Sequence, residues 1–224
     1  MIPTGLLGGS FNPAHRGHRR LSIGAAQRLG LQEVWWLVSP GNPLKPQKGM
    51  APLPARLASA RAAARRAPVR VTAIEAELGT RYTVDSLARL VRLYPGRRFV
   101  WLMGADNLAQ FHRWRDSRRI ARLVTIAVVT RPGYDGAALK APAMGWLRRF
   151  VRPAAAAKHW TNWSLPSLVL LELPPDPTSA TAIRAADPRW HESVMKSFHS
   201  EALRDGVTRR RLSEPRQQRR HFAR

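Results

Sequence analysis

Residues 5–18 read Gly-Leu-Leu-Gly-Gly-Ser-Phe-Asn-Pro-Ala-His-Arg-Gly-His, an apolar strand pattern that passes through two glycines into a helix start. Glycine lets a backbone approach a ligand closely. The first turn of the following helix presents free N–H groups and the positive end of the helix dipole, and both suit phosphate. His15 and His18 lie three residues apart on that turn and can point the same way. The stretch therefore predicts a strand–loop–helix unit in which imidazoles and backbone donors bind an anion.

This loop matches neither the Gly-x-Gly-x-x-Gly dinucleotide fingerprint nor the Gly-Lys-Ser/Thr end of a P-loop. Two histidines also allow a metal pair, but no third ligand stands nearby and the chain has no cysteine. We therefore predict no metal site built from protein ligands. Ordinary histidines at a helix start, with no role in binding, are the remaining alternative.

Further apolar runs alternate with helical patterns along the chain. Several runs, such as residues 34–38 and 168–171, are apolar on both faces, which is typical of parallel strands covered by helices. This alternation predicts an α/β fold: a single domain with a Rossmann-like, doubly wound parallel sheet and helices on both faces. The expected strands are residues 5–9, 34–39, 69–74, 99–104, 124–130 and 168–173, and the expected helices are residues 17–29, 54–67, 84–93, 116–121 and 144–151.

Composition narrows the class of protein. The absence of cysteine excludes a disulfide framework and thiolate catalysis, and is most simply explained by a reducing cytoplasm. No apolar run approaches the roughly 20 residues of a membrane span, so we expect no contact with a membrane. The formal net charge is +24, and 33 of the 38 basic residues are Arg. This excess fits an Arg-biased genome, a nucleic-acid surface or a field that attracts anionic substrates.

Two motifs carry a family resemblance. The pattern Gly9-Ser10-Phe11-Asn12-Pro13-x-His15-x-Gly17-His18 resembles the signature of the His-x-Gly-His nucleotidylyltransferase superfamily. Residues 179–184, Ser-Ala-Thr-Ala-Ile-Arg, resemble its second motif, Ser-Ser-Thr-x-x-Arg. The chain departs from these motifs at Asn12, where Asp is usual, and at Ala180, where Ser is usual. Within the superfamily, four stretches resemble bacterial nicotinate-nucleotide adenylyltransferases: residues 35–45, 81–87, 101–108 and 111–114.

The resemblance implies an enzyme that transfers AMP from ATP to nicotinate mononucleotide, giving deamido-NAD and pyrophosphate, with Mg²⁺ accompanying ATP. The implied catalytic donors are His15, His18, Lys45 and Arg184. The implied ATP-binding residues are Gly8, Gly9, Ser10, Phe11, His15, His18, Gly104, Asp106, Ser179, Thr181 and Arg184. The implied residues for nicotinate mononucleotide are Asn42, Lys45, Thr83, Trp114 and Arg131.

Each implied role has a structural alternative. Thr83 and Asp106 can be helix caps, Trp114 can be a core aromatic, and Asn42 can be a turn residue. The charged side chains can be solvated surface groups. For the whole chain, the alternatives are another member of the superfamily, using phosphopantetheine or CTP, or a basic nucleic-acid-binding protein on a degenerate core. No recognition-helix, RRM or KH pattern supports the last.

The end of the chain differs from the rest. We predict a nucleotidylyltransferase catalytic domain over residues 1–187 and an atypical basic segment, partly disordered, over residues 188–224. Residues 208–224 are Arg-rich with little periodicity, and we expect a poorly ordered tail there. Nucleic acid is an expected partner only of that tail. Trp160 and Trp163 are predicted either to pack beneath the site loops or to contact a second subunit.

Overall fold

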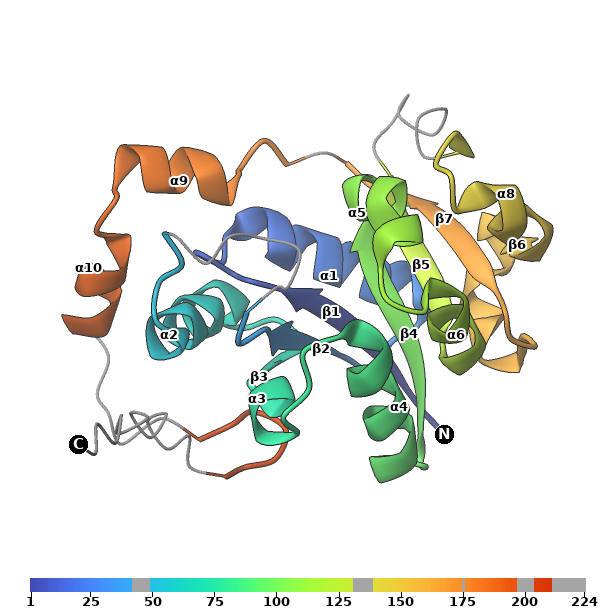
Figure 1. Ribbon diagram of the computed structural model, residues 1–224, viewed down its shortest axis with the longest axis horizontal. Helices are drawn as coiled ribbons and strands as arrows, with labels where there is room; N and C mark the ends of the chain where they lie inside the picture. Colours follow the sequence, from blue (N-terminus) through green and yellow to red (C-terminus); the bar gives the residue numbers. More distant parts are fainter. Residues whose placement is uncertain (42–48, 131–138, 175, 197–203, 211–224) are drawn as a thin grey trace, which may run out of the picture.

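The computed structural model describes residues 1–41, 49–130, 139–174, 176–196 and 204–210. Its described strands form one parallel sheet with the order β3-β2-β1-β4-β5-β7-β6 (Figure 1). The order reverses between β1 and β4, the point at which doubly wound sheets bind ligands beyond the carboxyl ends of their strands. The strands are β1 (Ile2–Gly9), β2 (Glu33–Val38), β3 (Val69–Thr72), β4 (Arg97–Gly104), β5 (Thr125–Thr130), β6 (Val151–Arg152) and β7 (Leu168–Glu172).

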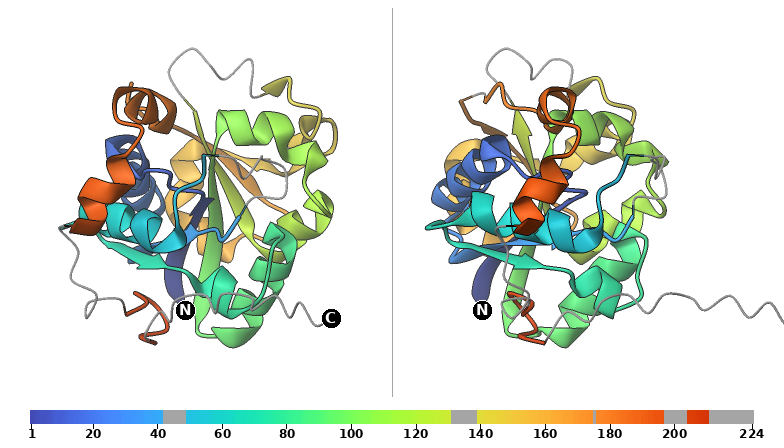
Figure 2. Two further views of the ribbon diagram at one scale, coloured as in Figure 1. Left: turned by 60° about the vertical axis from the view of Figure 1, so that its left-hand side comes forward. Right: turned by 90° about the vertical axis from the view of Figure 1, so that its left-hand side faces the viewer.

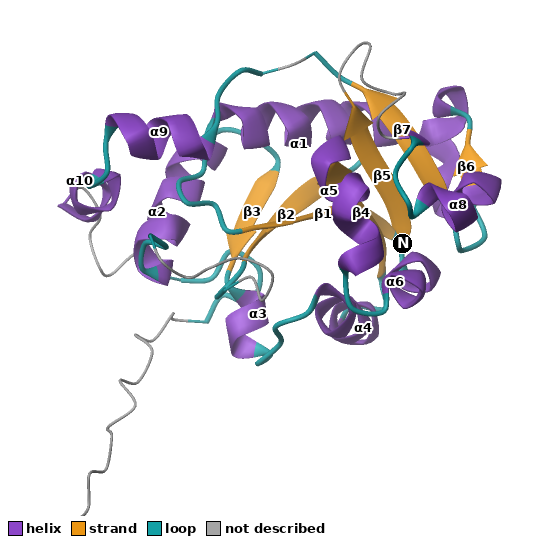
Figure 3. Cartoon of the chain, turned by 45° about the horizontal axis from the view of Figure 1, so that its top comes forward, coloured by secondary structure: helices purple, strands orange, loops and turns teal. Residues whose placement is uncertain are grey.

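Helices cover both faces of the sheet (Figure 3). Alternation along the strands divides the core: Leu7 and Trp36 pack with α1 and α2 on one face, whereas Leu6 and Trp35 pack with α4 and α6 on the other. The α-helices are α1 (Arg16–Leu29), α2 (Leu53–Ala64), α3 (Ile74–Glu77), α4 (Thr83–Leu93), α5 (Ala105–Gln110), α6 (Ser117–Leu123), α8 (Met144–Leu147), α9 (Ala180–Ala186) and α10 (Trp190–Lys196). Within the described residues, 3-10 helices span Phe111–Arg113, Arg148–Phe150 and Ala154–Asn162.

The predicted fold class is confirmed, and each of the six expected strands is present. The predicted helix over residues 144–151 is wrong in its second half, because α8 ends at Leu147 and residues 151–152 form the short edge strand β6. Val151 favours an extended backbone, and Pro153 disfavours helical dihedrals at the residue before it. No helix in the described ranges is long and apolar enough to cross a membrane.

The segment after residue 187 is partly packed. Helix α10 lies beside α2, and its Trp190, which the sequence left unplaced, is buried (Figure 2). Residues 204–210 also contact the core, so the expectation of a poorly ordered tail is wrong for residues 208–210.

Trp160 is buried too, and its indole N–H donates to the carbonyl of Leu29 at the end of α1 (3.0 Å). It packs in the core rather than beneath the site loops.

Candidate active site

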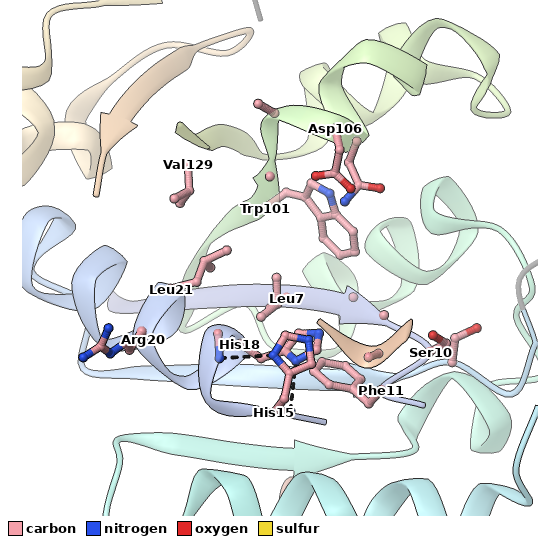
Figure 4. A pocket seen from close by; sticks show the side chains of 18 of the residues that line it. Leu7, Ser10, Phe11, His15, His18, Arg20, Leu21, Trp101, Asp106 and Val129 are labelled. Atoms are coloured by element: carbon pink, nitrogen blue, oxygen red, sulfur yellow. Dashed lines mark hydrogen bonds between the residues drawn. The ribbon is translucent and has the colours of Figure 1, made fainter. Parts of the chain in front are cut away.

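A large cavity lies where β1 and β4 diverge. Its volume is about 1170 Å³, above the roughly 300–1,000 Å³ typical of a site for one small ligand. The first loop forms one side, and α4, α5 and the end of β4 form the other (Figure 4). Of the predicted site residues, those that line it are Gly8, Gly9, Ser10, Phe11, His15, His18, Thr83, Gly104, Asp106 and Trp114.

Two histidines form a reciprocal cap at the start of α1. The Nδ1 atom of His15, the N-cap residue, accepts from the backbone N–H of Gly17 (3.1 Å). The Nδ1 atom of His18 accepts from the backbone N–H of His15 (3.2 Å). Since each Nδ1 atom accepts a hydrogen bond, the proton of each neutral ring sits on Nε2. The two rings, with centroids 3.9 Å apart, thus keep their Nε2–H groups available as donors (Figure 4).

Both imidazoles are held neutral. Burial, followed by the neighbouring His15, lowers the pKa of His18 to about 3. Burial also lowers the pKa of His15, against a smaller opposing effect of Asp176. At neutral pH the pair therefore offers two uncharged donors in fixed tautomers.

Other residues of the first motif pack against the rings of His15 and His18. A Cβ atom at Gly17 would lie 3.0 Å from ring atoms of His15, so a larger residue would crowd that ring where it folds back over the helix start. The ring of His18 packs against Phe11 (centroids 4.9 Å apart), which stacks on Trp36 (5.0 Å). Phe11 has a positive φ of 47°, a conformation that costs free energy and that this packing holds in place.

The side chain of Asn12 donates one hydrogen bond and accepts another, and an aspartate could make only the second. Its Nδ2 atom donates to the carbonyl of Gly49 (3.0 Å), and its Oδ1 atom accepts from the N–H of Ala51 (3.1 Å). A carboxylate accepts but cannot donate, so it would face the Gly49 carbonyl without a hydrogen bond. The departure from the usual motif therefore joins the first loop to the start of α2.

Arg56 is a site residue that the sequence did not reveal. Its side chain lies in the interior, with the residue only 1% exposed. It donates to the carbonyls of Ser10 (2.8 Å), Ser39 (2.6 Å) and Ala51 (2.9 Å). Burial lowers its pKa to about 10. The guanidinium thus ties the loop after β1 to the loop after β2, a role that nothing in the Ala- and Arg-rich sequence of α2 signals.

The second motif meets the first. Arg184 donates through one nitrogen to the carbonyl of Asn12 (2.6 Å) and through another to Oγ1 of Thr181 (3.3 Å). Ser179 caps α9 by accepting from the N–H of Ala182 (3.1 Å). Ser179, Thr181 and Arg184 are not among the described residues that line the cavity, whereas their neighbours Thr178 and Ala180 are.

Asp176 holds the loop before α9 against α1. Its carboxylate pairs with Arg16 (3.0 Å) and Arg20 (3.4 Å), and accepts from the N–H of Thr178 (3.0 Å). Hydrogen bonds from Thr178, with a smaller contribution from Arg16, lower the pKa of Asp176 to about 2. This ion pair is a second contact that sequence reasoning missed.

The opposite side of the cavity corrects two alternatives. Tyr82, not Thr83, is the N-cap of α4, and no side chain caps that helix, so Thr83 is not a cap. Gly104, not Asp106, is the N-cap of α5, likewise without a side-chain bond. Asp106 lies in the first turn of α5, and a Cβ atom at Gly104 would lie 2.5 Å from its carboxylate.

Trp114 is both packed and facing the cavity. Its ring meets Trp101 (centroids 6.1 Å apart) and Phe111 (5.4 Å) at steep angles. Trp101 also lines the cavity, is 3% exposed, and has an indole N–H without a partner among the described residues. The three predicted residues Asn42, Lys45 and Arg131 lie outside the described residues.

Comparisons with known proteins agree with this geometry. A family model described as cytidylyltransferase-like matches residues 6–186. The protein "Probable nicotinate-nucleotide adenylyltransferase" of Erythrobacter litoralis is 61% identical over 211 residues, covering 94% of each chain. A protein of the same name from Cereibacter sphaeroides is 50% identical over 187 residues, covering 84% of this chain and 98% of its own. Because 211 residues exceed the length of the predicted catalytic domain, the Erythrobacter match extends into the C-terminal segment.

A solved structure shares the fold. The nicotinic acid mononucleotide adenylyltransferase of Plasmodium falciparum, complexed with NaAD, superposes with a TM-score of 0.63 at 14% sequence identity. The superposition covers 88% of this chain and 96% of the Plasmodium chain. At this identity, the likeness concerns the arrangement of the sheet and helices alone.

Burial of His18 should make stability depend on pH. Its folded pKa of about 3 lies below the unfolded value of about 6.5, so the unfolded chain takes up a proton first as the pH falls. The contribution of the neutral His18 ring to the free energy of unfolding is complete above pH 6.5. Below that pH it should decline by about 1.4 kcal/mol per pH unit. Urea unfolding at pH 7, 6 and 5 should show a shallower decline for His18→Gln than for the wild type. Equal slopes would contradict the buried neutral ring.

Proposed function

The chain belongs to the cytidylyltransferase-like family, and we propose that it transfers the adenylyl group of ATP to nicotinate mononucleotide, releasing pyrophosphate and forming deamido-NAD. One observation carries this proposal. The cavity has room for more than one small ligand, and the neutral pair His15 and His18 lies on its wall, where a transferring phosphoryl group needs donors. The relatives named above match this chain over most of its length and carry the name of this activity.

The reaction is an in-line displacement at the α-phosphorus. An oxygen of the acceptor's 5′-phosphate forms a bond to that phosphorus, while the bond to the bridging oxygen of the β-phosphate breaks and pyrophosphate leaves with the electron pair. A phosphate dianion is already nucleophilic, so no side chain has to remove a proton. Catalysis then consists of positioning and electrostatic stabilisation.

His15 and His18 supply that stabilisation in our proposal. Their Nε2–H groups donate to phosphate oxygens on which charge accumulates, and they need no reorganisation because Nδ1 of each ring is fixed by a backbone N–H. The N-terminus of α1 adds the positive end of the helix dipole. Arg184 acts here through Asn12, whose carbonyl it binds, as well as through its charge. Lys45 remains a proposed phosphate contact.

The two sides of the cavity suit the two substrates. We assign the ATP ribose to Gly104 and Asp106, because a carboxylate can accept from both ribose hydroxyls. We assign the acceptor to Thr83 and Trp114, because a flat aromatic ring can stack on the pyridine. Asn42 and Arg131 are proposed to complete the acceptor site.

Mg²⁺ enters this proposal with ATP. In the described ranges, no three His, Cys, Asp or Glu side chains come together as a protein-held metal requires. The side chain of Asn12 is already bonded to the backbone of residues 49 and 51. The described residues do not fit a protein-held metal, so we propose that Mg²⁺ binds the phosphate oxygens of ATP and water. The cytoplasmic location likewise stays a prediction.

An acceptor panel tests the reaction. Pyrophosphate release should be fast with ATP and nicotinate mononucleotide. It should be much slower when nicotinamide mononucleotide or phosphopantetheine replaces the acceptor, or when CTP replaces ATP. The product with nicotinate mononucleotide should have the mass of deamido-NAD. A preference for phosphopantetheine or CTP would assign the chain to another branch of the family.

Removing one donor tests the mechanism. His18→Ala should lower kcat by about 10²–10³ and change the KM for ATP much less, because the donor acts mainly in the transition state. The matched control is His159→Ala, an exposed histidine in the 3-10 helix Ala154–Asn162. Wild-type turnover in His18→Ala would remove this residue from the mechanism.

Two further variants separate the substrate sites. Asp106→Asn should raise the KM for ATP about tenfold, since charge-assisted hydrogen bonds contribute about 1.5–3 kcal/mol. Trp114→Ala should raise the KM for the mononucleotide by a similar factor, since stacking contributes about 1–3 kcal/mol. Initial rates with each substrate varied in turn measure both constants. If the two variants affected the opposite substrates, the assignment of the two sides would be reversed.

A further inference from the structure

A short segment near the end of the chain is docked on residues that precede it by more than a hundred positions. Residues 204–210 lie beside α3 (Figure 1). Within them Asp205 is 0% exposed. Its carboxylate accepts from Oγ1 of Thr72 (2.9 Å) and from the N–H of Ala73 (2.7 Å). A buried carboxylate is costly unless donors surround it, so this arrangement indicates a specific docking site.

The other residues of the segment 204–210 also make specific hydrogen bonds at this docking site. The N–H groups of Val207 (2.8 Å) and Thr208 (2.9 Å) also donate to Asp205, closing a tight turn. The N–H of Gly206 donates to the carbonyl of Val71 (2.9 Å). A Cβ atom at Gly206 would lie 2.4 Å from that carbonyl oxygen, so a larger residue could not dock. The segment covers part of β3, which is an edge strand of the sheet.

The docked carboxylate completes the start of α3. Ala73 is the N-cap of this helix, and no side chain of its own caps it. Asp205 takes the N–H of Ala73, and Oγ1 of Thr72, which donates to Asp205, accepts from the N–H of Ile74 (3.0 Å). Asp205 thus accepts the N–H of the N-cap residue directly, and it also binds the Thr72 hydroxyl that accepts the next N–H, although it follows both residues by more than a hundred positions.

Helix α3 in turn holds a wall of the cavity. Glu75 lines the cavity and is 8% exposed. Its Oε1 atom accepts from Oγ of Ser86 (2.7 Å), which also bonds Oγ1 of Thr80 (2.9 Å). Ser86 lies one turn beyond Thr83 in α4. A continuous series of contacts thus joins Asp205 to the side of the cavity that we assign to the acceptor.

We propose that residues 204–210 are a clasp that positions the α3–α4 wall, with Asp205 as a positioning residue for the acceptor mononucleotide. The identity of that acceptor rests on the proposed function. The described contacts of the clasp are with β3, α2 and the neighbourhood of α3, not with His15, His18, Asp106 or Arg184. Loss of the clasp should therefore weaken acceptor binding and spare ATP binding.

The test uses Asp205→Asn in the full-length chain. An asparagine replaces one acceptor oxygen with an amide that must face N–H donors, so the clasp should release. The KM for nicotinate mononucleotide should rise about tenfold or more, because small displacements of positioning groups have effects of this size. The KM for ATP should stay within about twofold. The matched control is Glu192→Gln, the same chemical change at an exposed residue of α10.

Two truncations and an activity-independent measurement complete the design. A chain ending at residue 210 keeps the clasp and should behave as the wild type, whereas a chain ending at residue 203 should behave as Asp205→Asn. Hydrogen exchange should be faster over residues 73–86 only when the clasp is lost.

The proposal is overturned if exchange over residues 73–86 is unchanged without the clasp, or if both KM values rise together. A wild-type protein that does not use nicotinate mononucleotide would instead refute the proposed function, while the exchange result would still report on the clasp.

Discussion

The site depends on how the backbone turns from β1 into α1. Two imidazoles take the first free N–H groups of that helix, so the hydrogen bonds that cap α1 also fix which nitrogen of each ring faces the cavity. Gly17 makes room for one ring, and Phe11 packs against the other. A helix cap made of aspartate would satisfy the same N–H groups, but its carboxylate would leave no donor for a phosphate.

Distant segments then close around this turn. Arg184 binds the backbone of Asn12, Asp176 pairs with α1, and Arg56 joins the loops after β1 and β2. In each contact a charged side chain near the cavity binds either a backbone carbonyl or a side chain of opposite charge. The net charge of +24 therefore includes arginines with defined structural partners. The remainder is compatible with a biased composition and with substrates that are both anionic.

Much of this could be predicted from the sequence, because the informative signals were local. Doubly apolar strands identified the parallel sheet, and the spacing of His15 and His18 predicted that both rings lie together, as they do on the cavity wall. Arg56 and Asp205 were missed because folding brings them to partners far along the chain, backbone carbonyls for Arg56 and the Thr72 hydroxyl and Ala73 N–H for Asp205. Nothing in the sequence around them distinguishes them from solvated charges. The strand β6 was missed because two residues carry no periodic pattern. The roles of Lys45, Asn42 and Arg131 remain predictions.

The position of Asp205 in the chain has a consequence for synthesis. Strand β3 and helix α3 are synthesised more than a hundred residues before the Asp205 carboxylate that binds Thr72 and Ala73. A nascent chain can assemble the sheet and the histidine turn while one wall of its cavity still lacks its final contact. Chains that end prematurely before this residue would share almost the whole fold and yet hold the cavity unfinished. The docking of residues 204–210 thus separates a chain with a finished cavity wall from one that has the same sheet without it.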